Sequence, residues 1–371
     1  MNKQAIRSAE ADQRKRRITT MQSFNVPPTM HVVKLAQLGA SAPSFEFDEM
    51  PVPQPGPGEF LVRVGACGVC GHDALARRGE LSAKPGDVLG HEIAGRVVAV
   101  GSAELDDWVG RRVALVQRRP CGHCPDCQRG VTSQCRRGPG FYGDDIQGGY
   151  AQYVTADPLN AVQIPDTITD GLAAIASCGI GTGLHALRRS QVSTGDVVVI
   201  TGAGGGVGFN AVRTAQALGL RVIATTSDEA KVSAIAAAGA ERTLLRPDSR
   251  AIRAAATEMN RPRGADAVLE ITGGPTFGTS LRSLAPQGRL ILIGNTVPAN
   301  LDLDPGLTIV KELHVIGSAH ATRADLQDVI DMIASKTLIP SPPREMPLAS
   351  AADAHTALDN RTTTGRTVLV P

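Results

Sequence analysis

Hydrophobic and polar positions follow two different patterns along the chain. Between Met30 and about Ala156, short apolar segments are broken by glycine and proline, which is typical of strands joined by tight turns. The clearest of these predicted strands are 60–66, 93–101 and 150–156. We therefore expect this part of the chain to be rich in β-structure.

From Asp196 onward, strand-like and helix-like patterns alternate. The run Val197–Ile200 is apolar at every position, as expected for a parallel strand that is buried on both faces. This βαβ rhythm predicts a doubly wound parallel sheet, so the fold class is α/β with a β-rich domain beside it. Further elements are predicted as helices at 206–218 and 229–238, as strands at 221–226, 267–271, 289–293 and 315–316, and as a last strand at 366–370 that rejoins the first domain.

Length and charge narrow the class of protein. A chain of 371 residues is long enough for two domains with separate cores, and its net charge of +2 argues against nucleic acid or a membrane surface as the main partner. Residues 1–29 carry a basic cluster at 14–17, and no apolar stretch follows it as a secretory signal would require. We expect these residues to form a disordered extension, and we expect a small molecule as the partner.

The seven cysteines are clustered rather than spread along the chain. In a chain of this size, such clustering favours metal ligation over disulfides and predicts a reducing compartment, most simply the cytoplasm. Four of them form the pattern C-x2-C-x2-C-x7-C, which suits a closed, structural zinc site. Free thiols or an iron–sulfur cluster are the alternatives, although the last interval differs from the bacterial ferredoxin spacing. These four residues are Cys121, Cys124, Cys127 and Cys135.

A second set of metal ligands is drawn from distant parts of the chain. Cys70 and His91 are candidate ligands, and Cys178 is a candidate for the third. Three protein ligands leave one coordination position open for a substrate oxygen. Asp73 and Glu92 are expected to orient His91 and tune the site. Taken singly, Cys178 can equally be a small buried apolar residue and His91 a structural histidine, while Cys67 is expected not to be a ligand.

A glycine-rich turn follows the strand at 197–200 and precedes a helix. Glycines at such a turn let backbone amides approach the pyrophosphate of a dinucleotide. The pattern is carried by Gly202, Gly204 and Gly208, with Gly206 close to it.

The end of the next strand indicates which dinucleotide is bound. It carries Thr226 and Ser227, with no acid before Asp228, whereas an acid at this point would recognise the ribose 2′-hydroxyl of NAD. Asp228 is expected in the first turn of the next helix, where its charge suits the helix dipole. NADP is therefore preferred over NAD, although no arginine follows Ser227 directly.

The chain resembles the zinc-containing alcohol dehydrogenases of the medium-chain dehydrogenase/reductase superfamily. The resemblance rests on the order and the separations of four motifs: Cys70, the Gly-His-Glu at 90–92, the four-cysteine loop and the glycine turn. The resemblance covers about residue 30 to the C-terminus. It implies a GroES-like catalytic domain over 30–180 and 322–371, a Rossmann cofactor domain over 181–321, and an active site in the cleft between them. It also implies a homodimer or homotetramer.

Roles for individual residues follow from the same resemblance. Cys70, His91 and Cys178 resemble the ligands of the family's catalytic zinc, which with the structural site makes two zinc ions per chain. Thr182 resembles a residue near the nicotinamide, and Gly294 lies in a segment similar to the one that lines the nicotinamide pocket.

One departure from the family pattern concerns His72. Many relatives carry serine or threonine at this position, and its hydroxyl starts a proton relay from the zinc-bound alcohol. An imidazole can do the same work near neutral pH, or it can bond the cofactor instead. Leu75 stands where some relatives have a histidine that extends the relay, and Gln117 is expected to make the substrate pocket more polar than usual.

These observations favour a zinc-dependent oxidoreductase that moves a hydride between an alcohol or carbonyl substrate and NAD(P). The catalytic residues are expected to be His72, Asp73 and Glu92. An NADPH-dependent enone or enoyl-thioester reductase is the alternative among enzymes, because the glycine turn and the strand after it also resemble that branch. A non-catalytic NAD(P)-binding sensor that keeps the fold is the alternative from another class.

Overall fold

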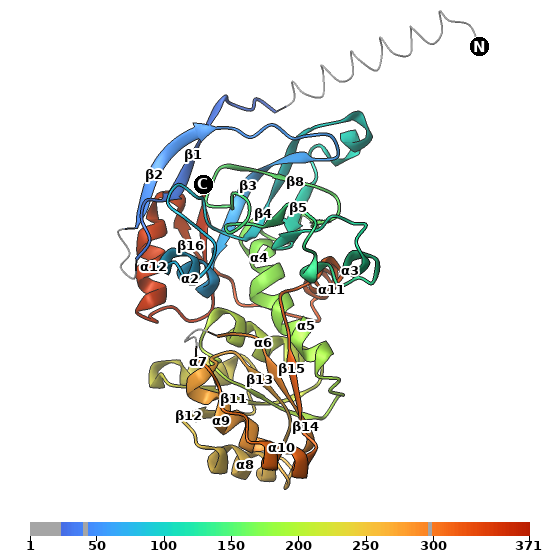
Figure 1. The fold of residues 1–371 in the computed structure, drawn as a ribbon, viewed down its shortest axis with the longest axis vertical. Coiled ribbons are helices and arrows are strands. Elements are labelled where there is room, and N and C mark those ends of the chain that lie inside the picture. Colours follow the sequence, from blue (N-terminus) through green and yellow to red (C-terminus); the bar gives the residue numbers. More distant parts are fainter. Residues whose placement is uncertain (1–23, 40–43, 296–298) are drawn as a thin grey trace, which may run out of the picture.

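The computed structural model describes residues 24–39, 44–295 and 299–371. The molecule has two lobes, each built on its own sheet (Figure 1). The predicted class, α/β with a β-rich part beside a doubly wound parallel sheet, is confirmed. Most of the extension predicted at 1–29 lies outside the described residues, but Phe24 and Val26 pack against the core of the first lobe.

The main sheet of the first lobe combines strands from both ends of the chain. Its strands are β3 (Phe60–Val69), β4 (Glu92–Val100), β5 (Arg112–Leu115), β8 (Tyr153–Ala156), β9 (Ala161–Gln163), β16 (Arg344–Pro347) and β17 (Thr367–Val370). In the described part of the chain they follow the order β16-β17-β3-β4-β5-β9, and β8 also pairs with β3. Gly68 in β3 lies opposite Glu92 on one side and Val368 on the other. The end of β3 and the starts of β4 and β17 therefore meet at one edge.

The remaining elements of the first lobe cover this sheet. The antiparallel pair β1 (Thr29–Leu35) and β2 (Phe45–Pro51) contributes Val32, Val33 and Leu35 to the core. A short pair, β6 (Arg118–Arg119) and β7 (Gly140–Phe141), lies beside the four-cysteine loop. The helices are α2 (Gly71–Arg78), α3 (Pro125–Gln128) and α12 (Ala351–Asp359), with 3₁₀ turns at Ala103–Trp108, Thr132–Gln134 and Leu348–Ser350.

The second lobe is a parallel sheet. Its strands are β10 (Val197–Ile200), β11 (Arg221–Thr226), β12 (Arg242–Leu245), β13 (Ala265–Glu270), β14 (Leu284–Leu292) and β15 (His314–Gly317). Among the described residues their order is β12-β11-β10-β13-β14-β15. The order reverses between β10 and β13, and ligands of such sheets bind outside the carboxyl ends of the strands at this point. The helices of this lobe are α6 (Gly206–Ala217), α7 (Val232–Ala237), α8 (Ser249–Glu258), α9 (Gly274–Ser283) and α10 (Pro305–Lys311).

A continuous helical segment joins the two lobes. It consists of α4 (Asp170–Ile175), a π-helical stretch at Ala176–Gly181, and α5 (Thr182–Arg189). All six residues of the π-helical stretch are buried. In Figure 1 this green segment lies between the two sheets, and α11 (Arg323–Ala334) packs against its π-helical part.

Several predicted elements differ from the observed ones at their ends. The strand expected from Tyr150 begins at Tyr153, because the backbone amides of Tyr150 and Gln152 donate to Leu89 and His31 instead of the sheet. The helix expected at 229–238 is divided into a 3₁₀ turn, Glu229–Lys231, and α7. The strands at 197–200 and 221–226 are confirmed at both ends. Within the described residues, no helix has the length and apolar character needed to cross a membrane.

Candidate metal and cofactor site

Three side chains from separate segments meet at the edge where β3 ends and β4 begins. Cys70 follows β3, His91 precedes β4, and Cys178 lies in the π-helical stretch. Their ligand atoms, together with a carboxylate oxygen of Glu92, all lie within 4.8 Å of one another. The two sulfurs are 3.9 Å apart, close to the roughly 3.8 Å that tetrahedral Zn–S bonds of about 2.3 Å imply. The chemistry and spacing of these donors therefore fit zinc.

Glycines allow the ligands to approach this closely. Gly90 has a φ of +97°, and a Cβ atom there would lie 2.5 Å from the Tyr150 ring. A side chain at this position would displace the turn that presents His91. Cys67, expected not to be a ligand, is buried against the same turn and is not part of the metal-ligand group.

Asp73 fixes the orientation of His91. Its carboxylate lies 3.1 Å from Nδ1 of His91 and accepts a hydrogen bond of 2.8 Å from the backbone amide of Cys70. With Nδ1–H donating to Asp73, the lone pair of Nε2 is left for a metal, and Nε2 is buried without a hydrogen-bond partner among the described residues. Burial on its own would raise the pKa of Asp73, but the charge of His91 and this hydrogen bond hold it below its usual value.

Glu92 is bound to an arginine that sequence reasoning did not find. Nη2 of Arg366 donates to Glu92 at 2.5 Å and lies 3.8 Å from the sulfur of Cys178. Both side chains are at most 5% exposed. Burial raises the pKa of Glu92 to about 7, against the opposing charge of Arg366. No motif marks Arg366, which is placed here by the pairing of β17 with β3.

Arg366 also reaches the glycine turn of the other lobe. A Cβ atom at Gly206 would lie 2.5 Å from Nη1 of Arg366. One guanidinium group thus touches a metal-site carboxylate and the start of α6. This contact joins the two halves of the candidate site.

His72 points toward a carboxylate that the sequence pattern did not indicate. Nε2 of His72 lies 2.6 Å from Asp144. The other oxygen of Asp144 is buried without a partner among the described residues. The His72 ring is also 5.1 Å from that of the candidate metal ligand His91. Asp144 lies in the loop after β7, 72 residues away in sequence, so neither spacing nor composition links it to His72.

An aromatic ring connects His72 to the second lobe. The ring of Phe141 lies 4.7 Å from that of His72, 5.1 Å from that of His91 and 4.9 Å from that of His320. His320 follows β15 and adopts a φ of +58°. Burial, together with the charges of His72 and His91, lowers the pKa of His320 to about 3, so this imidazole is neutral at pH 7.

Gln117 is a polar side chain in the interior beside this cluster. It is fully buried, and neither its amide nitrogen nor its oxygen has a partner in the described part of the chain. Its backbone carbonyl accepts a hydrogen bond of 3.0 Å from the amide of Tyr142, the residue after Phe141. An unpartnered buried amide costs free energy, so the amide nitrogen and oxygen of Gln117 are available to form hydrogen bonds with a ligand.

The glycine turn has the close backbone approaches that its sequence predicted. Gly202 has a φ of +59°, and a Cβ atom at Gly208 would lie 2.4 Å from the carbonyl oxygen of Gly202. At Gly204 a Cβ atom would lie 2.6 Å from the side chain of Lys231. The helix α6 begins at Gly206, so its first amides face the turn. This backbone cradle fits a pyrophosphate at a helix N-terminus.

Two other predicted cofactor residues lie on the segments around this turn. The Thr182 hydroxyl, at the start of α5, is buried without a partner among the described residues. At Gly294, a Cβ atom would lie 2.1 Å from the carbonyl oxygen of Ile271. Gly294 follows β14 at the carboxyl edge of the sheet, where dinucleotides bind in this topology.

At the end of β11, the Thr226 hydroxyl accepts a hydrogen bond of 3.1 Å from the Asp228 amide. The Asp228 carboxylate accepts from the amide of Ala230 and lies 3.9 Å from Nζ of Lys231. Asp228 thus caps the following 3₁₀ turn, and the strand end itself carries no acid.

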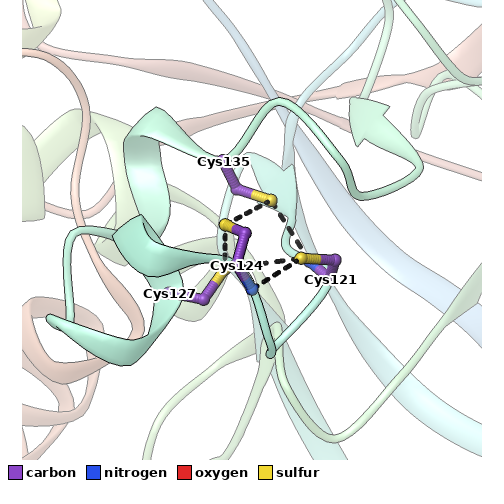
Figure 2. Close-up of side chains that lie close together, drawn as sticks. All are labelled: Cys121, Cys124, Cys127 and Cys135. Atoms are coloured by element: carbon purple, nitrogen blue, oxygen red, sulfur yellow. Dashed lines mark hydrogen bonds between the residues drawn. The ribbon is translucent and has the colours of Figure 1, made fainter.

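The four-cysteine loop brings its sulfurs together (Figure 2). All four lie within 4.8 Å of one another, and three of the separations are 3.5 to 3.9 Å. The backbone amides of Cys124 and Cys121 each donate to a sulfur of the group at 3.3 Å. Amides directed at sulfur stabilise thiolates, the form that binds metal. The donor set fits a closed tetrahedral zinc site.

Comparisons with known proteins agree with this geometry. Residues 56–166 match the family model described as the alcohol dehydrogenase GroES-like domain. Residues 206–335 match the model described as zinc-binding dehydrogenase. The two matches cover the metal-ligand edge of β3 and β4, the four-cysteine loop and most of the parallel sheet.

Individual relatives span nearly the whole chain. The acryloyl-coenzyme A reductase of Metallosphaera sedula is 30% identical over 298 residues, covering 80% of this chain and 87% of the relative. An alcohol dehydrogenase of Schizosaccharomyces pombe is 30% identical over 329 residues, 87% of this chain and 93% of the relative. A solved structure of a protein called AibC is 39% identical, with a TM-score of 0.84 over 93% of this chain and 96% of that one. The chain belongs to the zinc-type medium-chain dehydrogenase/reductase superfamily and is an oxidoreductase of that superfamily.

Proposed function

We propose that this oxidoreductase depends on zinc and moves a hydride between an alcohol or carbonyl substrate and NADP. The observation that carries the proposal is the meeting of two sulfurs and one imidazole from three distant segments within 4.8 Å. Three such ligands leave a fourth position for a substrate oxygen. We further propose two zinc ions per chain, the second one held by Cys121, Cys124, Cys127 and Cys135.

The proposed roles divide the work among the residues of the site. When bound, zinc would supply a Lewis acid for the substrate oxygen and the dinucleotide would supply the hydride carrier. Asp73 holds His91 in the tautomer that offers Nε2. Arg366 balances the charge of Glu92 beside the sulfur of Cys178.

Proton transfer is assigned to His72. With Nε2–H donating to Asp144, Nδ1 is the nitrogen that can accept a proton from the substrate hydroxyl or return one to it. The hydroxyl of Thr182 and the backbone at Gly294 are proposed to position the nicotinamide. The backbone of the glycine turn, with Gly202, Gly204, Gly206 and Gly208, is proposed to hold the pyrophosphate.

A second candidate function is the NADPH-dependent reduction of an α,β-unsaturated thioester. The similarity to an acryloyl-coenzyme A reductase over 80% of the chain favours it. The same site can polarise the carbonyl of a thioester, and the two functions then differ in the carbon that receives the hydride. In one case it is the carbonyl carbon, in the other the β-carbon of the double bond.

The proposed cellular location of the enzyme rests on its cysteines. None of the seven cysteines forms a disulfide, which supports the proposed cytoplasmic location. We propose a homodimer or homotetramer as the assembled form, with a small molecule as the substrate.

A substrate panel with metal analysis tests the proposal. Purified protein is assayed with alcohols, aldehydes, ketones, enones and enoyl thioesters, each with NADP(H) and NAD(H). Activity on alcohols and carbonyls is expected; activity confined to activated double bonds would establish the second function instead. Cofactor binding without turnover anywhere in the panel would indicate a sensor and overturn both.

Variants of the metal site make the test residue-specific. Cys178→Ala is expected to remove about one zinc per chain, whereas Cys67→Ala, a matched buried cysteine outside the ligand group, keeps both. His72→Ala is expected to lower kcat by about 100-fold or more with zinc content unchanged. Loss of zinc in His72→Ala would assign His72 to the metal site and overturn its proton-transfer role.

A further inference from the structure

The carboxyl ends of β11 and β12 lie side by side and carry a basic group that no sequence motif indicated. The two strands are parallel neighbours, with Thr226 opposite Leu245. Arg246, the residue after β12, therefore lies next to the end of β11. The sequence places it 19 residues after Ser227, and no arginine follows Ser227 directly.

Backbone contacts hold Arg246 over Ser227. Its amide donates to the carbonyl oxygen of Thr226 at 2.8 Å, and its Nε donates to the carbonyl oxygen of Ser227 at 3.0 Å. Its φ of +44° lies in the left-handed region. The guanidinium group is thus fixed through one nitrogen, and its two terminal amino groups remain for another acceptor.

Nearby acids do not neutralise this charge. The carboxylate of Asp228 accepts from Ala230 and faces Lys231, and that of Asp248 accepts from Ala251 at the start of α8. In the described part of the chain, no carboxylate lies within 4.0 Å of Arg246. By contrast, Arg242, four residues earlier, is paired with Glu258 at 3.2 Å.

A second cation at this end of the site, Lys231, already has protein acceptors. Lys231 is only 8% exposed, and its Nζ donates to the carbonyl oxygens of Arg361 and Thr363 at 2.7 and 2.8 Å. It therefore ties the glycine turn to the C-terminal segment. By contrast, the terminal nitrogens of Arg246 have no protein acceptor among the described residues.

We propose that Arg246 binds the 2′-phosphate of NADP and, together with Thr226 and Ser227, sets the preference for NADP over NAD. In a doubly wound sheet the adenosine ribose lies at the end of the second strand, which here is β11. The two free amino groups of a guanidinium match two oxygens of a phosphate. The hydroxyls of Thr226 and Ser227 tolerate a phosphate where a carboxylate would repel it.

This inference rests on the proposed use of NADP, and the experiment separates the two. Dissociation constants of NADPH and NADH are measured by fluorescence titration for the full chain and for Arg246→Ala, Arg246→Lys and the control Arg242→Ala. Arg246→Ala is expected to weaken NADPH binding by about tenfold to 100-fold and to change NADH binding by less than about twofold. Arg246→Lys is expected to lie between, because it keeps the charge but loses the planar pair of donors.

Each outcome has a separate meaning. Wild-type protein that binds NADPH more tightly, with the preference lost only in Arg246→Ala, supports the inference. An unchanged preference in Arg246→Ala overturns the role of Arg246 and leaves the use of NADP standing. Wild-type protein that prefers NADH overturns both, whereas zinc-dependent hydride transfer is unaffected.

Discussion

A chain of buried polar side chains runs from the candidate metal ligand His91 into the core of the first lobe. Asp73 joins His91 to the hydroxyl of Tyr150, and that hydroxyl lies 3.0 Å from Nε2 of His355. His355 is fully buried in α12, and burial lowers its pKa to about 4. The orientation of the His91 ring is thus linked, through Asp73 and Tyr150, to the His355 imidazole, which must stay neutral for the lobe to remain packed.

We expect this lobe to lose stability as the pH falls from about 6.5 to about 4. In this window the unfolded chain binds a proton at residue 355 that the folded chain does not. Lowering the pH across this window therefore decreases the free energy of unfolding, by about 2–3 kcal/mol in total. Urea unfolding at pH 7, 6 and 5 checks this, followed by the fluorescence of Trp108. That residue is the single tryptophan, and it stacks on Phe60 in this lobe.

His355→Gln, which cannot take up a proton, is expected to flatten the pH dependence of the urea midpoint. His314→Gln, at an exposed position of the other lobe, serves as the control and should retain the wild-type slope. Equal slopes in all three proteins would mean that His355 does not contribute to acid sensitivity.

At the residue scale, the sequence could indicate groups whose chemistry is local. The four-cysteine spacing and the Gly-His-Glu segment predict sets that the structure brings together. Arg366, Asp144 and His320 could not be found this way, because each reaches the site through a strand or loop distant in sequence. Nothing in the immediate sequence around such residues distinguishes them from ordinary surface or core positions.

The loop that carries Cys121, Cys124, Cys127 and Cys135 has little other structure to hold it. Between its first and last cysteine it contains α3, of four residues, and one 3₁₀ turn of three. Most of its other side chains are exposed or half-buried. Such an element would depend on the zinc proposed for it, because binding free energy would replace the missing core.

Removing one sulfur is therefore expected to open the loop locally. Cys127→Ser should lose about one zinc per chain and become at least about tenfold more sensitive to trypsin at the exposed Arg129, Arg136 and Arg137. Limited proteolysis with mapping of the fragments measures this. Gln134→Ser, an exposed change in the same loop, should keep wild-type resistance, and equal cleavage of both variants would contradict a structural role for the metal.

At the element scale, periodicity could predict the strands that are buried on both faces. The runs at Val197–Ile200 and Arg221–Thr226 have no exposed positions, so their largely apolar composition indicates strands buried on both faces. The strand β12 escaped prediction because its residues are half-buried or exposed, and β2 because none of its positions is buried and acids interrupt its apolar residues. Their positions depend on tertiary pairing with β11 and β1, which composition does not encode.

On the scale of the whole molecule, one edge of the parallel sheet is open and apolar. β15 is the last strand at that edge, and Val315 on it is 40% exposed. On the neighbouring α10, Ile309 and Val310 are 74% and 84% exposed. Among the described residues β15 pairs with β14 alone, and such an edge strand beside exposed apolar side chains is typical of an association surface, which supports the proposed homo-oligomer.

The double variant Ile309→Asp/Val310→Asp is expected to convert the proposed homo-oligomer to monomers. Burying two added carboxylates in an apolar contact is unfavourable, whereas the folded monomer tolerates them on its surface. Sedimentation velocity measures the change in mass. Ile339→Asp, at a position 69% exposed elsewhere, is the matched control; monomers there as well, or an unchanged double variant, would place the association surface outside α10.

The helical segment from Asp170 to Arg189 has a practical consequence for anyone who exchanges parts of this enzyme with a relative. Its first part packs on the sheet of the first lobe and its last part on α6 of the second, and Cys178 lies in the wide turn between them. A chimaera joined inside it would take the first part from one parent and the last part from the other, so the packing that positions Cys178 and Thr182 would come from two different proteins. Junctions placed before Thr169 and after α5 keep this helical segment intact, so recombined enzymes are best designed to take all of it from a single parent.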